Sequence, residues 1–117
     1  MENQPLGDRI VRNFEFLRQL ILTKSEHRRR QLLSEASSDQ LLAIVEICSN
    51  VLSRDFVLNK RQHTKLLPHS YLLKSLSRTR TEQGARKKLV QQGSGAFLPA
   101  LLIPVLVEAA RYFLNES

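Results

Sequence analysis

The sequence predicts an all-α protein built around a single core. Apolar residues recur every three or four positions through the first half of the chain, which is the periodicity of an amphipathic helix. No stretch of useful length alternates apolar and polar residues as a half-buried strand does. Apolar residues make up 42% of the 117 residues, which is enough for one core, and the chain is too short for two ordinary domains.

The N-terminal half contains three expected helices. Asp8 can cap the first, because apolar residues then follow at helical spacing, namely Ile10, Phe14, Leu17 and Ile21. Ser25 opens a second, shorter helix that closes near Ala36. Ser38 caps a third, whose apolar face consists of Leu41, Ile44, Val45, Cys48 and Leu52.

Helical patterns in the second half of the chain are shorter. Asn59 can cap a segment that ends before Pro68, and residues 71–76 add a further turn or two. Thr81 can start a segment that runs to Gln92. Isolated helices shorter than about 12 to 15 residues are barely stable in water, so these pieces depend on tertiary packing.

Three parts are expected along the chain. Residues 1–76 form a helical bundle, and residues 77–95 form a basic joint that ends in a flexible Gly-Ser-Gly hinge. Residues 96–117 form a hydrophobic C-terminal helix, in which Pro104 is expected to cause a kink.

The C-terminal segment has twelve uncharged residues, 96–107. As a helix it would be about 18 Å long, which is too short to cross a bilayer core of about 30 Å. Two alternatives stay open for its apolar side chains: they pack on the rest of the chain or on a second copy, or they bind a capsid protein or a membrane interface. The candidate anchor residues are Phe97, Leu98, Leu101, Leu102, Ile103, Val105 and Leu106.

The net charge of +7 is concentrated in the middle of the chain. Residues 1–53 carry seven basic and seven acidic residues, whereas residues 54–90 carry ten basic and two acidic ones. So many like charges repel one another unless a polyanion neutralises them, which predicts contact with the phosphates of duplex DNA. The candidate nucleic-acid-binding residues are Lys60, Arg61, Lys65, Lys74, Arg78, Arg80, Arg86, Lys87 and Lys88, and the triplet 28–30 is a second candidate patch.

No catalytic or metal-binding motif is apparent, so we expect neither an enzyme nor a cofactor. His27, His63 and His69 lack metal-ligand spacing, and the glycines near residue 94 lack the lysine of a phosphate-binding loop. Cys48 lies on the apolar face of an expected helix and is interpreted as a core residue. The N-terminal sequence does not resemble a secretory signal, which predicts an intracellular protein.

A more specific alternative is a helix-turn-helix that recognises a DNA sequence, with residues 25–36 and 39–52 as its two helices. The second of these is largely apolar and carries Asp39 and Glu46, so phosphate contact without sequence preference is favoured. The main alternative is a helical protein-interaction adaptor or a capsid- or membrane-associated protein whose charge does not serve DNA binding.

Residues 86–106, RKKLVQQGSGAFLPALLIPVL, resemble the small basic proteins of adenovirus-like viruses and Maverick/Polinton-type elements. The segment is similar to the end of the adenoviral core protein precursor called pX or mu, and residues 46–52 and 58–62 look like the element-encoded proteins. The resemblance extends over residues 14–107. It implies a non-enzymatic virion protein that condenses duplex DNA in the host nucleus or the particle. The chain departs from the adenoviral pattern because it lacks a dense arginine tract and has a neutral helical half.

Overall fold

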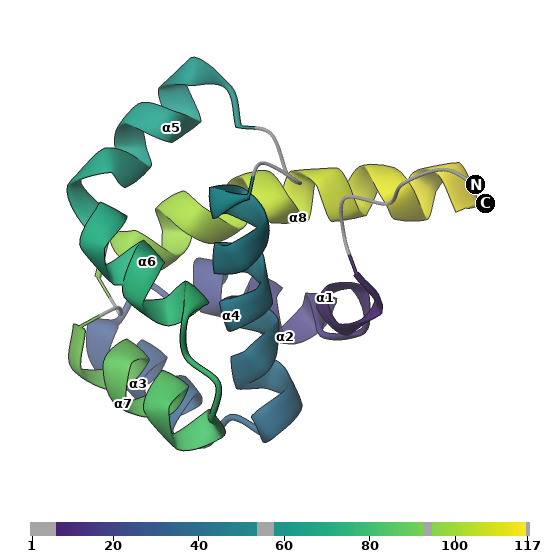
Figure 1. The fold of residues 1–117 in the computed structure, drawn as a ribbon. Coiled ribbons are helices and arrows are strands. Elements are labelled where there is room, and N and C mark those ends of the chain that lie inside the picture. Colours follow the sequence, from purple (N-terminus) through teal and green to yellow (C-terminus); the bar gives the residue numbers. More distant parts are fainter. Residues whose placement is uncertain (1–6, 54–57, 93–94, 117) are drawn as a thin grey trace.

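The computed structural model describes residues 7–53, 58–92 and 95–116, and within them all regular secondary structure is helical, which confirms the all-α prediction (Figure 1). The elements are α1 (Asp8–Arg12), α2 (Phe14–Leu22), α3 (Glu26–Ser34), α4 (Ser38–Leu52), α5 (Lys60–Leu66), the 3₁₀ helix η1 (Leu67–His69), α6 (Ser70–Ser77), α7 (Glu82–Gln92) and α8 (Phe97–Glu116).

Local capping explains where several helices begin. The Ser25 side chain accepts a hydrogen bond from the backbone of Arg28 at the start of α3. Asn59 and Gln62 form a reciprocal capping box at the start of α5. The cap of α4 is Ser37, one residue earlier than predicted, because Ser37 forms a capping box with Gln40.

The first expected helix is divided in two at Asn13, so the prediction of one continuous helix from Asp8 is wrong. Asn13 leaves the helical conformation, with φ −103° and ψ 19°. Its side-chain nitrogen donates to the carbonyl of Arg9 at 2.8 Å, and a side chain that bonds to nearby backbone competes with continued helix formation. The cap that precedes α1 is Gly7.

Helix α4 lies at the centre of the fold and is apolar on most of its surface. It packs against α1, α6 and α7, and its buried residues are Leu41, Ala43, Ile44, Val45, Ile47 and Cys48. Burial raises the pKa of the Cys48 thiol to about 12, so the group stays protonated at neutral pH. The interpretation of Cys48 as a core residue is confirmed.

The first half of α8 belongs to the same core, which corrects the prediction that the C-terminal segment is separate from the bundle. The helix packs against α2 and α5, and five of the seven candidate anchor residues are almost completely buried: Phe97, Leu98, Leu101, Leu102 and Val105. The Phe97 ring meets His69 of η1 edge-on, with ring centroids 5.7 Å apart. Of the other two candidates, Ile103 is exposed and Leu106 is half-buried.

Residues 77–95 are likewise more than a basic joint. They contain the 11-residue helix α7, whose Ala85 and Leu89 are buried in the core. The expected hinge residues Gly93 and Ser94 lie outside the described residues. One core therefore extends from α1 to α8, and the predicted boundaries at residues 76 and 95 do not separate domains.

Figure 1 shows how the helices are arranged in space. Helices α5, α6 and α7 follow one another along one side of the molecule, and α8 runs behind α4. The C-terminal end of α8 extends away from the other helices. The basic middle of the sequence thus forms one continuous side of the fold.

Leu101→Ala should lower the free energy of unfolding by about 2 to 5 kcal/mol, because it leaves a cavity in a packed core. Leu101 is 0% exposed, whereas Ile103, on the same helix, is 47% exposed and provides the matched control. Ile103→Ala should change the free energy by no more than about 0.5 kcal/mol. Urea unfolding followed by circular dichroism measures both. Equal losses in the two variants would contradict the assignment of α8 to the core.

Candidate nucleic-acid interface

Seven of the nine candidate nucleic-acid-binding residues are exposed. They are Lys60, Arg61 and Lys65 of α5, Lys74 of α6, Arg78 and Arg80 in the turn after it, and Lys87 of α7. No Asp or Glu of the described residues lies within salt-bridge distance of any of them. We call this set the cationic face.

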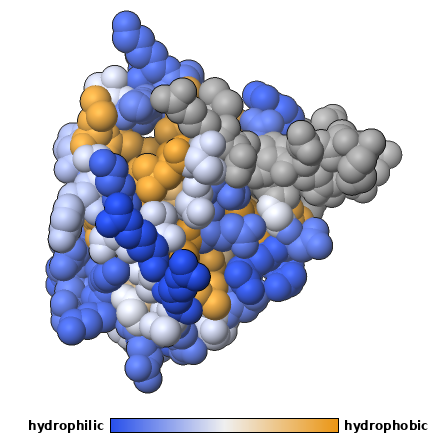
Figure 2. Space-filling model, in the orientation of Figure 1, coloured by the Kyte–Doolittle hydropathy of each residue, from blue (hydrophilic) through white to orange (hydrophobic). Residues whose placement is uncertain are grey.

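The outward side of η1 and α6 shows how the helical repeat builds this face. Leu67, Tyr71, Lys74 and Arg78 follow one another at helical spacing and are all exposed, whereas the opposite side of α6 is buried. Tyr71 is 83% exposed. In Figure 2, strongly hydrophilic side chains cross the region where Figure 1 places α6, and a hydrophobic area lies next to them.

Arg86 is a structural residue, which corrects its assignment to the DNA-binding set. One of its guanidinium nitrogens donates to the carbonyls of Leu33, Ser34 and Ala36 at 3.2, 2.6 and 3.0 Å. Another pairs with Glu82. Leu33 and Ser34 are the last residues of α3, and Ala36 lies in the connection to α4. A helix ends in carbonyls that lack intrahelical donors, so a cation there donates to them and interacts favourably with the negative end of the helix dipole. Arg86 thereby fixes α7 to α3.

Lys88 has the same function at the end of α6. Its ammonium group donates to the Ser75 carbonyl at 3.1 Å and to the Thr79 hydroxyl at 2.9 Å. Thr79 in turn donates to the Ser75 carbonyl at 3.1 Å. Of the basic run 86–88, only Lys87 is exposed to solvent.

The arginine triplet 28–30 does not form one patch. Arg29 is buried, and its guanidinium donates to the carbonyls of Thr23 at 2.8 Å and Gly95 at 3.4 Å, which connects the end of α2 to the start of α8. Arg30 pairs with Glu26 at 3.0 Å. The sequence offered a signal for this arrangement, because Arg29 precedes buried Leu33 by four residues and so shares its face of α3.

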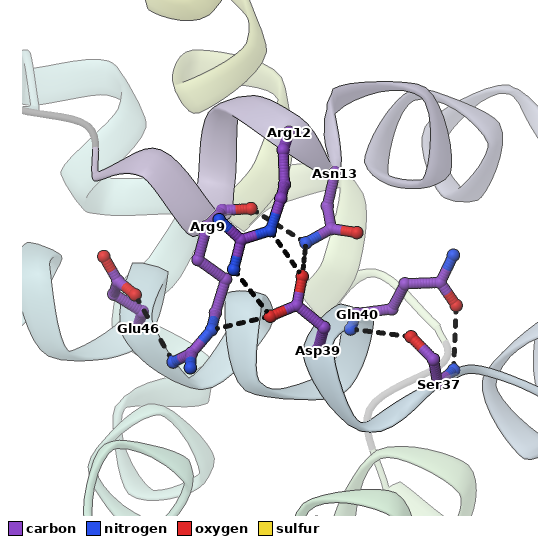
Figure 3. A network of polar contacts seen from close by, with 7 residues as sticks. All are labelled: Arg9, Arg12, Asn13, Ser37, Asp39, Gln40 and Glu46. Carbon is purple, nitrogen blue, oxygen red and sulfur yellow. Dashed lines mark hydrogen bonds and ion pairs between the residues drawn. The ribbon is translucent and has the colours of Figure 1, made fainter.

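Two arginines of the N-terminal half are engaged by Asp39 (Figure 3). Arg12 binds both oxygens of this carboxylate at 3.0 Å, and Arg9 binds one of them at 3.1 Å. Asn13 donates to it at 2.8 Å. Hydrogen bonds from Arg12 and Asn13 hold the pKa of Asp39 well below its usual range.

The same network attaches α1 to α4 (Figure 3). Arg9 also pairs at 3.7 Å with Glu46, which lies two turns after Asp39 on the same side of α4. Arg9 and Arg12 are therefore already neutralised within the protein, unlike the residues of the cationic face. The structure also argues against the helix-turn-helix considered for residues 25–36 and 39–52. Its second helix, α4, packs against α1, α6 and α7, and Asp39 at its start binds Arg9 and Arg12, so this helix is not free to enter a DNA groove.

Other kinds of site find little support in the described parts of the chain. No group of three His, Cys, Asp or Glu side chains there is placed to hold a metal ion. Nor does any single helix in the described ranges have the length and apolar composition needed to cross a membrane. Comparisons with protein-family models, curated proteins and solved structures find no match to this chain.

Arg86→Gln and Lys88→Gln should each lower the free energy of unfolding by about 1 to 3 kcal/mol, because helix-end carbonyls lose their donors. Lys87→Gln removes the same charge from an exposed position and should change it by no more than about 0.5 kcal/mol. Thermal and urea unfolding of the three variants measures the difference. If all three were equally stable, the structural assignment of Arg86 and Lys88 would be wrong.

Asp39→Asn should destabilise the protein most at neutral pH. Because the folded-state pKa of Asp39 is lowered, its charged form stabilises the fold above the unfolded pKa of about 3.9, and this contribution is lost as the pH falls below that value. The difference in thermal unfolding midpoint between wild type and variant, measured by circular dichroism, should therefore be smaller at pH 3 than at pH 7. Glu15→Gln, which breaks an exposed ion pair with Arg18, is the control and should show little effect at either pH.

Proposed function

We propose that this protein binds duplex DNA without catalysis, and that it does so mainly through phosphate contacts from the cationic face. The observation that carries the proposal is that seven exposed basic side chains, on α5, α6, the turn after α6 and α7, have no carboxylate partner among the described residues.

Mutual repulsion on this side of the molecule favours a polyanionic partner. At physiological salt, exposed charges are screened over about 8 Å, so the repulsion is strongest between like charges on segments that pack together, such as α6 and α7. A polyanion relieves the repulsion and releases its own condensed counterions, which supplies most of the free energy of nonspecific DNA binding.

A duplex is favoured over a single strand because bases of a single strand need aromatic side chains on which to stack. Of the four aromatic side chains whose exposure the structure describes, which are Phe14, Phe16, Tyr71 and Phe97, Tyr71 is largely exposed, Phe14 is half-buried, and Phe16 and Phe97 are in the core. Contacts to phosphates position a protein on DNA and carry little sequence information.

The resemblance of residues 86–106 to adenovirus-like core proteins adds a biological context to this proposal. It supports DNA condensation in a virion, and location in the host nucleus and the particle stays a prediction. Burial of α8 changes one part of that picture, because residues such as Leu101 and Leu102 are covered by the chain itself and are not free to bind a capsid or a membrane.

A second candidate function is a protein-interaction adaptor. It is favoured by Ile103 and Val107, which lie four residues apart on α8 and are both about half exposed. Ile103 belongs to the predicted anchor set and Val107 follows it, and together they form a small apolar strip that is available to a protein partner or a second copy.

The test is a titration of a 20-base-pair duplex with the full chain at several salt concentrations, followed by fluorescence anisotropy. If about five phosphates are neutralised, the slope of log K against log salt should be near −4.5. The variant Lys74→Gln/Arg78→Gln/Lys87→Gln should bind more weakly, and the slope should flatten by up to about 2.7, because each lost phosphate contact removes about 0.9.

The matched control removes three exposed basic residues from elsewhere: Arg18→Gln/Lys24→Gln/Arg28→Gln has the same net charge. It should retain most of the affinity and the full slope. If both triple variants lost affinity and slope equally, overall charge would explain binding and the cationic face would not. A wild-type chain that does not bind the duplex even at low salt overturns the proposed function.

A further inference from the structure

The exposed side of α7 carries a row of long polar side chains. Gln83, Lys87 and Gln91 are spaced four residues apart and are exposed, while Ala85 and Leu89 on the opposite side are buried. In the described parts of the chain, neither glutamine side chain has a hydrogen-bond partner. Their donors and acceptors are therefore available to a ligand.

Helices α6 and α7 form a helix-turn-helix supported by α4. The turn consists of four residues, 78–81, and α4 packs against both helices. Its conformation is held locally: the Thr79 backbone donates to the Leu76 carbonyl at 3.0 Å, and the Thr81 hydroxyl accepts from the Gly84 backbone at 3.1 Å.

Close packing at Gly84 tightens this turn further. A Cβ atom there would lie 3.1 Å from the Thr81 hydroxyl and 3.2 Å from a methyl group of Thr79, which is closer than side chains normally approach. Together with Arg86 at the end of α3 and Lys88 at the end of α6, this packing holds α7 at a fixed orientation on the surface. A helix that contacts base edges needs such rigid support.

The side chains on α7 match the chemistry of base edges in the major groove. A glutamine amide can donate to N7 of adenine through its NH2 group and accept from the N6 amino group through its carbonyl oxygen, and a lysine can donate to O6 and N7 of guanine. The distance along the helix from Gln83 to Gln91 is about 12 Å, which is the length of roughly three to four base pairs. The major groove of B-form DNA, about 12 Å wide, admits an α-helix.

The cations beside this row are placed for phosphate contacts. Lys74 lies on the exposed side of α6, and Arg78 and Arg80 lie in the turn between α6 and α7. In a helix-turn-helix, the first helix crosses the DNA backbone while the second lies in the groove. These exposed charges are therefore available to phosphates while the uncharged amides of α7 contact bases.

From this geometry we infer that α7 is a DNA-recognition helix, with Gln83, Lys87 and Gln91 directed at base edges in the major groove. The inference rests on the proposed function, to which it adds a sequence preference. Phosphate contacts supply most of the affinity, and α7 makes some sequences better ligands than others. The prediction of binding with little sequence preference is refined accordingly.

The experiment starts with selection of duplexes from a randomised pool by the full-length wild-type chain. The selected duplex should bind roughly tenfold or more tightly than a shuffled duplex of the same composition, since one good bidentate contact discriminates by about that factor. Gln83→Ala/Gln91→Ala should remove most of this preference, since only the base contact of Lys87 stays, and should leave the salt slope unchanged, because no charge is lost. The control Gln19→Ala/Gln31→Ala, with exposed glutamines on α2 and α3, should retain the preference.

Several outcomes would overturn the inference. If the pool shows no enrichment while binding stays strongly salt-dependent, the cationic face binds DNA and α7 does not recognise sequence, so the proposed function survives. If the double variant keeps the preference, the recognition residues lie elsewhere. Equally tight binding to duplex RNA, whose deep and narrow major groove does not admit side chains from a helix, also excludes this docking mode. Absence of any binding defeats the inference and the proposed function together.

Discussion

Helices α1, α2, α3, α5 and α6 have five to nine residues each, and helices of that length are barely stable in water unless tertiary contacts hold them. A single shared core meets this requirement. Helix α4 supplies its centre, and α8 supplies a row of apolar side chains that covers α2 and α5. The C-terminal segment is apolar on several sides because it packs inside this core. Its composition is therefore explained by folding and does not require an external partner.

Basic residues perform two different tasks in this fold. Arg29, Arg86 and Lys88 donate to carbonyls at the ends of α2, α3 and α6, where helices lack internal donors. Long cationic side chains are suited to this task because they reach across a helix interface and also oppose the negative end of the helix dipole. The residues of the cationic face have no such contacts, which is why they are the ones available to a polyanion.

The two tasks are connected at α7. Arg86 and Lys88 point to α3 and α6, two of the helices that α7 packs against, and Lys87, between them, is exposed to solvent with Gln83 and Gln91. The residues that fix the helix therefore also determine which of its side chains a ligand can meet. Phosphate binding and a modest base preference are compatible in this arrangement, because charge is distributed over three helices while the amides are confined to one.

The sequence by itself determined the helical class, the position of most helices and the place of the excess charge. Caps such as Ser25, Asn59 and Thr81 and the apolar periodicity act within a few residues, so they can be recognised without any tertiary information. Charge density along the chain is equally local, and it correctly singled out the region that forms the cationic face.

Only the tertiary structure decided which basic residues bind within the protein, which are exposed, and where the C-terminal segment packs. Arg86 meets carbonyls that are 50 to 53 residues earlier in the chain, and Arg29 meets one that is 66 residues later. The Asn13 side chain at the break between α1 and α2 likewise donates to Asp39, 26 residues away. Adjacent basic residues look alike in the sequence, and contacts between distant segments decide which of them turn inward, because a buried carbonyl without a donor costs more than an exposed charge.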